Sequence, residues 1–127
     1  MKKLLVLLFS ILISFNSYGE WTRIIGSADG EETWYIDIYT IKESGGYVYW
    51  WEMVDYLKPD KFGDMSDKSY GQVNCSSMSY QYLQMIFSKQ SMGQGEGSTI
   101  TPTSGWHFVP PDSVGGKMLD FVCNYVK

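Results

Sequence analysis

Apolar and polar residues alternate along several short segments between Trp21 and Phe87, which is the pattern of β-strands. Glycine-containing turns and a polar loop with a proline at 58–64 separate these segments. The 21 Trp, Tyr and Phe residues of the chain support this interpretation, because aromatic residues favour strands and bury large areas. We therefore expect extended segments at residues 21–25, 33–38, 47–57, 70–80, 82–91 and 106–109.

The segment 47–57 is the strongest strand candidate, and both of its faces are largely apolar. One face carries Tyr47, Tyr49, Trp51 and Met53, and the other carries Val48, Trp50, Val54 and Tyr56. This pattern is typical of a central strand that is covered on both sides. A half-exposed strand that presents its aromatic rings to a ligand is the alternative.

The C-terminal segment has a different period. Residues 110–113, Pro-Pro-Asp-Ser, end the extended part of the chain and supply helix-capping side chains. Apolar residues then recur at three- and four-residue steps, which predicts an amphipathic helix. Its expected apolar face consists of Val114, Met118, Phe121, Val122 and Tyr125, flanked by Leu119, Cys123 and Val126. Gly115 and Gly116 weaken the first turn, so this helix should depend on packing against the rest of the domain.

Residues 1–19 have the layout of a secretory signal peptide. Two lysines precede an apolar run from Leu4 to Phe15, and small residues before Glu20 predict cleavage there. A membrane anchor is the alternative, but the run is shorter than the about 20 apolar residues that span a bilayer. No cysteine follows the run, so a lipoprotein is not expected. The prediction is one exported domain at 20–127, periplasmic or secreted, with no membrane insertion after cleavage.

The chain contains only two cysteines, Cys75 and Cys123. Exported proteins meet oxidising conditions and an even number of cysteines fits pairing, so we expect one disulfide; two free thiols are the alternative. The bond would close a loop of about 49 residues and stabilise the domain by about 4 kcal/mol. It would attach the terminal helix to the expected strand at 70–80. The predicted fold class is α+β.

Charge excludes two classes of partner. Without the signal peptide, the chain has 8 basic and 14 acidic side chains, a formal net charge of −6. Such a surface repels nucleic-acid phosphates and anionic lipid headgroups, so neither is expected to bind. An acidic balance does not by itself indicate a basic ligand, because it also serves solubility.

The sequence predicts no catalytic, metal-binding or cofactor-binding site. His107 is the single histidine, so the usual zinc sets and a Ser-His-Asp triad lack their residues. The glycine-rich stretch 93–97 lacks the Gly-Lys-Ser/Thr of a phosphate loop, and we interpret it as a mobile connection. Paired carboxylates could support glycoside hydrolysis, but those in turns and at strand ends are expected to be solvated. These pairs are Glu31/Glu32, Glu52/Asp55 and Asp60/Asp64.

An ordered set of short motifs runs along nearly the whole chain after the signal peptide. The motifs are Trp34-Tyr35-Ile36-Asp37, Ile41-Lys42, Trp50-Trp51, Asp55-Tyr56, Ser69-Tyr70, Asn74-Cys75, Tyr82, Met92-Gly93, Trp106, Pro110-Pro111-Asp112-Ser113 and Val122-Cys123. In this order, and with the two cysteines so placed, they resemble the surface-adhesin protein E family. The resemblance implies an antiparallel sheet of about six strands with a C-terminal helix packed on its concave face and tethered by the disulfide. Composition and spacing lead to the same arrangement.

The expected function is an exported, non-catalytic binding domain. The family resemblance implies adhesion to host matrix or serum proteins. The alternative is a periplasmic structural or accessory protein that binds a resident envelope partner. A hydrolase that uses carboxylates or His107 is the least favoured hypothesis. No motif identifies the ligand-binding residues or the oligomeric state.

Overall fold

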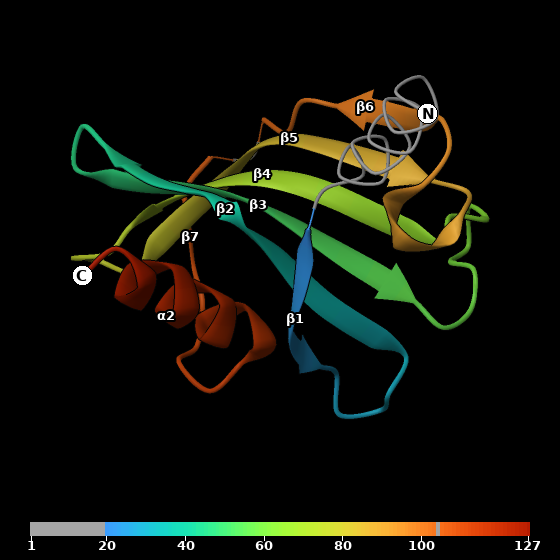
Figure 1. Cartoon of the computed structure of the whole chain (residues 1–127), viewed down its shortest axis with the longest axis horizontal. Helices are drawn as coiled ribbons and strands as arrows, with labels where there is room; N and C mark the ends of the chain where they lie inside the picture. The colour runs from blue at the N-terminus through green and yellow to red at the C-terminus, as the bar shows by residue number, and fades with distance from the viewer. Residues whose placement is uncertain (1–19, 104) are drawn as a thin grey trace, which may run out of the picture.

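The computed structural model describes residues 20–103 and 105–127, which form one antiparallel sheet and two short helices. Six strands neighbour one another in chain order: β1 (Trp21–Gly26), β2 (Glu32–Ser44), β3 (Tyr47–Tyr56), β4 (Ser66–Asn74), β5 (Ser79–Ser88) and β6 (Gly97–Ile100). A two-residue strand, β7 (His107–Phe108), pairs with the beginning of β5. The chain ends in the helix α2 (Val114–Tyr125), which lies under the sheet beside β1 (Figure 1). The expected α+β class, with a sheet of about six strands and a terminal helix, is confirmed.

Two of the expected strands, 70–80 and 82–91, have the wrong boundaries. The chain reverses at residues 75–78, between β4 and β5. Asn74 causes this turn, because its side-chain oxygen accepts hydrogen bonds from the backbone N–H groups of Ser76 and Ser77 at 3.0 and 3.4 Å. Cys75 therefore lies in a turn rather than within a strand.

Two further segments contain more strand than expected. β2 continues to Ser44 across an irregularity, where the Thr40 hydroxyl accepts a hydrogen bond from the Trp51 backbone N–H at 3.0 Å. Part of the glycine-rich connection pairs with β5 as β6. Gly97 permits this pairing, since a Cβ at that position would lie 2.3 Å from the Ile86 side chain.

The face of the sheet that carries α2, called here the helix face, contains the main hydrophobic core. Its fully buried members are Ile36, Val48, Trp50, Val73, Met118, Leu119, Val122 and Cys123. Trp50 packs directly over the backbone of β4, where Gly71 leaves room: a Cβ on Gly71 would lie 2.5 Å from the indole ring. The central strand thus buries its largest side chain beneath α2.

α2 begins as the sequence predicts. Ser113 is the N-cap, and its hydroxyl accepts a hydrogen bond from the Gly116 backbone N–H at 3.0 Å. Met118 and Val122 of the expected apolar face are buried, together with the flanking Leu119 and Cys123. Tyr125 was expected on the apolar face but is 50% exposed, because the buried face of the helix is centred nearer Leu119 and Cys123.

The disulfide between Cys75 and Cys123 is present, with the two Cα atoms 5.9 Å apart. It joins the last turns of α2 to the β4–β5 turn, and it holds the helix against one end of the sheet. Both cysteines are consumed by this bond, so neither is free.

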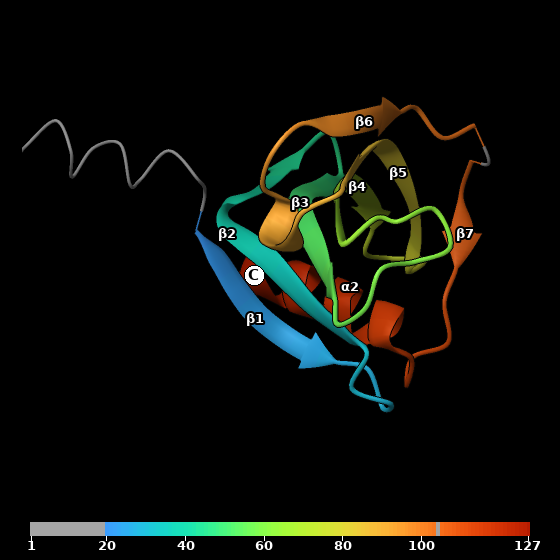
Figure 2. The same ribbon diagram turned by 90° about the vertical axis from the view of Figure 1, so that its right-hand side faces the viewer.

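The opposite face of the sheet is only partly covered. The short 3₁₀ helix η2 (Ser91–Gly93) lies over the ends of β3 and β4, where the Met92 backbone N–H donates to Asp55 Oδ1 at 2.7 Å. Met53 on this face is fully buried, whereas Tyr49 and Trp51 remain half-buried and pack against Tyr70. β3 is thus covered on both sides at one end only. Figure 2 shows the two edge strands of the sheet, β6 at the top and β1 at the lower left.

The predicted signal peptide at 1–19 lies outside the described residues. Within the part of the chain that the structure describes, no helix is both long enough and apolar enough to cross a bilayer.

Candidate functional site

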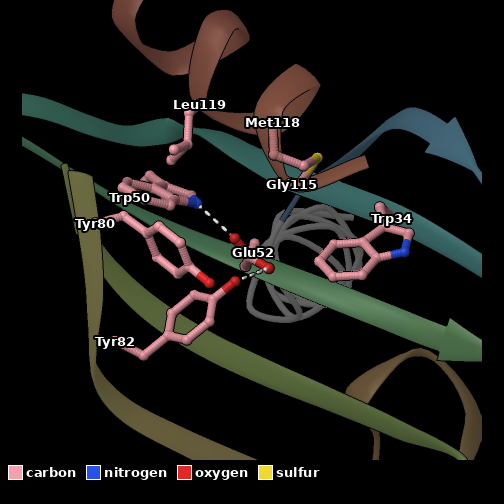
Figure 3. Close-up of a pocket in the computed structure, with 8 residues that line it drawn as sticks. All are labelled: Trp34, Trp50, Glu52, Tyr80, Tyr82, Gly115, Met118 and Leu119. Carbon is pink, nitrogen blue, oxygen red and sulfur yellow. Dashed lines mark hydrogen bonds between the residues drawn. The ribbon is translucent and has the colours of Figure 1, made fainter. Parts of the chain in front are cut away.

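A cavity of about 70 Å³ lies on the helix face, between the start of α2 and the strands β2, β3 and β5. Two tryptophans, two tyrosines, a glutamate and the first turns of α2 surround it (Figure 3). The lining residues are Trp34, Trp50, Glu52, Tyr80, Tyr82, Gly115, Met118 and Leu119. The strand register places the aromatic and acidic residues here, because each projects from its strand on the helix face.

Glu52 is the chemically distinctive residue of this cavity. It sits in the middle of β3 and is only 2% exposed. The Trp50 indole donates a hydrogen bond to Oε1 at 2.9 Å, and the Tyr82 hydroxyl donates to Oε2 at 3.0 Å (Figure 3). Burial raises the pKa of Glu52 to about 7, against the opposing effect of these two hydrogen bonds and with a further rise from the charge of Asp67. Burial also raises the pKa of Tyr82, which keeps its hydroxyl protonated as a donor.

The cavity continues along the helix face into a wider space of about 200 Å³ that α2 does not cover. Trp34, Glu52 and Tyr82 line both spaces. Asp67 of β4 lines the wider one, is 8% exposed and accepts a hydrogen bond from the Tyr56 hydroxyl. Burial raises the pKa of Asp67 to about 6, partly offset by that hydrogen bond.

A third space of about 360 Å³ adjoins the second, since Glu32 and Tyr56 line both. We call these three adjoining spaces, which share lining residues, the acidic groove. Its acidic residues are Glu31, Glu32, Glu52, Asp60 and Asp67, and its aromatic residues are Trp34, Trp50, Tyr56, Tyr80 and Tyr82. Lys58 is the one basic residue among those that line it. The ion pair of the described residues, Lys89 with Asp64 at 3.0 Å, lies outside the groove.

The groove combines concentrated negative charge with aromatic walls. Such a surface attracts a cation electrostatically and can pack aromatic faces against it. Among residues 20–103 and 105–127, no group of three or more His, Cys, Asp and Glu side chains is arranged to hold a metal ion. His107 lies in β7 with its ring 5.8 Å from that of Tyr80, and it does not line the groove.

Of the three carboxylate pairs that the sequence suggested, the structure separates one, Glu52/Asp55. Glu52 and Asp55 lie on opposite faces of β3, since Glu52 faces the cavity and Asp55 accepts from η2. The expectation that these pairs are solvated is wrong for Glu52, which is buried, and for Asp64, which is 8% exposed and pairs with Lys89. Glu31, Glu32 and Asp60 do meet, at the outer end of the groove.

Sequence reasoning missed Asp67 and the importance of Glu52. A signal for Glu52 was present, because it alternates in step with Val48, Trp50 and Val54 on an otherwise apolar face. A carboxylate at such a position is buried against neighbours and needs hydrogen-bond donors. No comparable signal marked Asp67, since the boundaries of its strand were misplaced.

A single antiparallel sheet and a disulfide-tethered terminal helix with an open groove beside it define the class as a small α+β domain. The family model described as surface-adhesin protein E matches residues 21–124, and the chain belongs to this family. The resemblance noted in the sequence is thereby confirmed. Family and fold together support an adhesin-like surface or exported protein, which suggests a binding rather than an enzymatic role.

Solved structures of Haemophilus influenzae protein E share the fold. Its crystal form II superposes with a TM-score of 0.61 at 20% identity, covering 84% of this chain and 90% of that one. A second structure of that protein gives 0.58 at 19% identity, covering 83% and 85%. The protein from a non-typeable strain gives 0.55 at 19% identity, covering 84% and 77%. A search of curated proteins found no significant match.

Proposed function

We propose that this chain is an exported, non-catalytic protein that adheres to host matrix or serum proteins through the acidic groove. The observation that carries the proposal is the groove itself, in which Glu52 and Asp67 lie between aromatic walls with no basic side chain bonded to them among the described residues. A charged site without an internal counter-ion is suited to an external partner.

Binding is better supported than catalysis. Both hydrogen bonds to Glu52 come from aromatic side chains, which position the carboxylate, and no described Ser, Thr, Cys, Lys or His side chain lines the cavity beside it. Both thiols are bonded to each other, and His107 does not line the groove. Membership of an adhesin family points the same way.

The proposal is tested with the exported, disulfide-bonded protein and two immobilised probes, vitronectin and laminin. We expect saturable binding to at least one of them, and an antibody against the protein should label intact cells. The protein with Glu52→Gln should bind more weakly, whereas the exposed matched control Glu96→Gln should bind as the parent does. Failure to label cells, combined with no binding to either probe, would remove the adhesin function.

A second candidate is a periplasmic structural or accessory protein that binds a resident envelope partner. It is favoured by the use of both cysteines in one disulfide, which leaves no thiol for a lipid anchor. Crosslinking in intact cells should then capture one reproducible envelope protein. A chain that is recovered uncrosslinked from the periplasm would contradict this candidate.

A further inference from the structure

The acidic groove has the charge, shape and donor groups to take a basic side chain. We propose that the partner inserts an arginine or lysine between Trp34 and Tyr82, so that its charge meets Glu52 and Asp67. This inference rests on the proposed function and deepens it, because it identifies which chemical group of the partner is recognised.

Charge complementarity is the first argument. Five carboxylates and one lysine line the groove, so a large part of the excess negative charge of the domain gathers in one depression. Low-dielectric walls focus the field of such charges and raise the local concentration of a cation. Raised pKa values at Glu52 and Asp67 reflect the same situation, in which buried carboxylates lack a positive neighbour.

Glu52 retains acceptor capacity for a ligand. An ionised carboxylate offers about four lone-pair sites, and each Glu52 oxygen accepts one hydrogen bond from an aromatic side chain. The two donors come from Trp50 and Tyr82, which fix the carboxylate plane within the cavity (Figure 3). A guanidinium or ammonium group can therefore add its own hydrogen bonds without displacing either aromatic partner.

The walls favour an organic cation over a metal ion. Trp34 and Tyr82 lie on either side of Glu52 (Figure 3), and aromatic faces attract guanidinium and ammonium groups through the ring quadrupole. The described residues contain no cluster of three ligands for a metal. The space of about 200 Å³ suits the charged head, because Glu52 and Asp67 line it together with Trp34 and Tyr82.

Trp34 acts as a wall of the site and not as a hydrogen-bonding group. Its Nε1 is buried, has no hydrogen-bond partner among the described residues and points away from Glu52 (Figure 3). The ring of Trp34 is therefore the part that can contact a bound cation. A peptide is proposed rather than a free amine because the partner in the proposed function is a protein.

The experiment uses the exported protein and short acetylated, amidated Gly/Ser peptides with one central residue. That residue is arginine, lysine or citrulline, the last being a neutral analogue of arginine. Binding is followed by tryptophan fluorescence and calorimetry at low and moderate salt. We expect the arginine or lysine peptide to bind about tenfold more tightly than the citrulline peptide, with weaker binding at higher salt.

Variants test the assigned residues. Glu52→Gln and Asp67→Asn should each weaken the basic peptide about tenfold. The exposed controls Glu96→Gln and Asp120→Asn make the same charge changes elsewhere and should leave affinity unchanged. Unaltered circular dichroism establishes that each variant is folded. The Trp34→Phe variant removes the indole N–H and part of the ring, so it tests whether Trp34 forms one wall of the site.

The outcomes separate this inference from the proposed function. Equal binding of arginine and citrulline peptides, or unchanged binding in both groove variants, would overturn the inference. Spermidine that binds as tightly as the arginine peptide would also overturn it, in favour of a free amine. If both groove variants still bind vitronectin or laminin, the inference is refuted but the adhesin function is supported. If the basic peptide binds but vitronectin and laminin do not, the inference is supported and the adhesin function is refuted.

Discussion

Glu52 shows how one residue can determine the character of a site. A carboxylate in the middle of an apolar strand face loses its water, and two aromatic donors only partly replace that solvation. Its pKa of about 7 follows from this deficit. The same burial that prepares the groove for a cation therefore weakens the folded state when Glu52 is ionised and no cation is bound.

The first prediction concerns the pH dependence of stability. The pKa of Glu52 rises from 4.5 to about 7 on folding, so between these values the folded state holds more protons than the unfolded state. The stability due to Glu52 is fully present below pH 4.5 and is lost as pH rises through 7. The full loss is about 3 kcal/mol.

Denaturant unfolding of the parent and of Glu52→Gln between pH 4.5 and 8 measures this effect. The amide cannot ionise, so the stability of the variant relative to the parent should increase with pH. Asp67, whose pKa is also raised to about 6, remains in both proteins, so the comparison reports Glu52 together with its interaction with Asp67. Parallel profiles for the two proteins would contradict the prediction.

The residue pattern contains a signal for part of this site, although Glu52 was expected to be solvated. Alternation along residues 48–54 places Glu52 with Trp50 on one face, so their hydrogen bond is accessible to sequence reasoning. Tyr82 is different, since it reaches Glu52 from β5 through the β4–β5 pairing that places it opposite Gly71. The two residues are 30 positions apart in sequence, so their contact leaves no periodic signal.

At the scale of elements, the two glycines at the start of α2 have different roles. A Cβ on Gly116 would lie 2.5 Å from the Pro110 carbonyl oxygen and 2.6 Å from that of Pro111. A Cβ on Gly115 would meet the Val109 side chain at 3.3 Å, a contact that a small side-chain movement relieves. Position 116 thus requires glycine, despite its weak helix propensity, because the backbone of residues 110 and 111 lies so close to it.

The second prediction compares these positions. Gly116→Ala should lower the free energy of unfolding by about 1–3 kcal/mol, because the backbone that Cβ would strike cannot move freely. Gly115→Ala, its matched control, should change stability by less than about 1 kcal/mol, since gained helix propensity offsets the tighter contact. Thermal and denaturant unfolding provide the measurement. Equal losses at the two positions would show that the first turn tolerates no side chain at all.

The disulfide supplies the third prediction. The bond spans 48 residues in sequence, so removing it with Cys75→Ser and Cys123→Ser should lower the free energy of unfolding by about 4 kcal/mol. A reductant should lower the melting temperature of the parent but leave that of the double variant unchanged. Hydrogen exchange should show the largest loss of protection in α2, the element that the bond tethers. If protection falls uniformly instead, the bond does not act on the helix in particular.

The bond could be predicted from sequence, but its position in the fold could not. An even number of cysteines in a chain with an export signal indicates pairing. The location of Cys75 in a turn depends on Asn74, whose side chain binds two following N–H groups. Residues 70–80 nevertheless read as one extended run, because several of them also favour strands.

At the scale of the molecule, the sheet was the most predictable part. Its six main strands follow chain order, so each pairs with its neighbour in sequence through a local connection. The groove was not predictable, because it arises beside the start of α2, where four strands, β2 to β5, contribute side chains to a space that the helix leaves open. Its residues are scattered between Glu31 and Leu119, and none forms a contiguous motif.

The last prediction concerns export of the whole chain. We expect cleavage before Glu20, a mature protein in the periplasm or medium, and an intact mass two hydrogens below that of the fully reduced form. Fractionation followed by mass spectrometry measures all three, with a cytoplasmic and a lipoprotein marker as controls. A protein recovered with a lipid mass or in the membrane fraction would contradict the expected localisation. Location also decides between the two proposed functions, because host proteins reach only a displayed or released chain, whereas an envelope partner meets it in the periplasm.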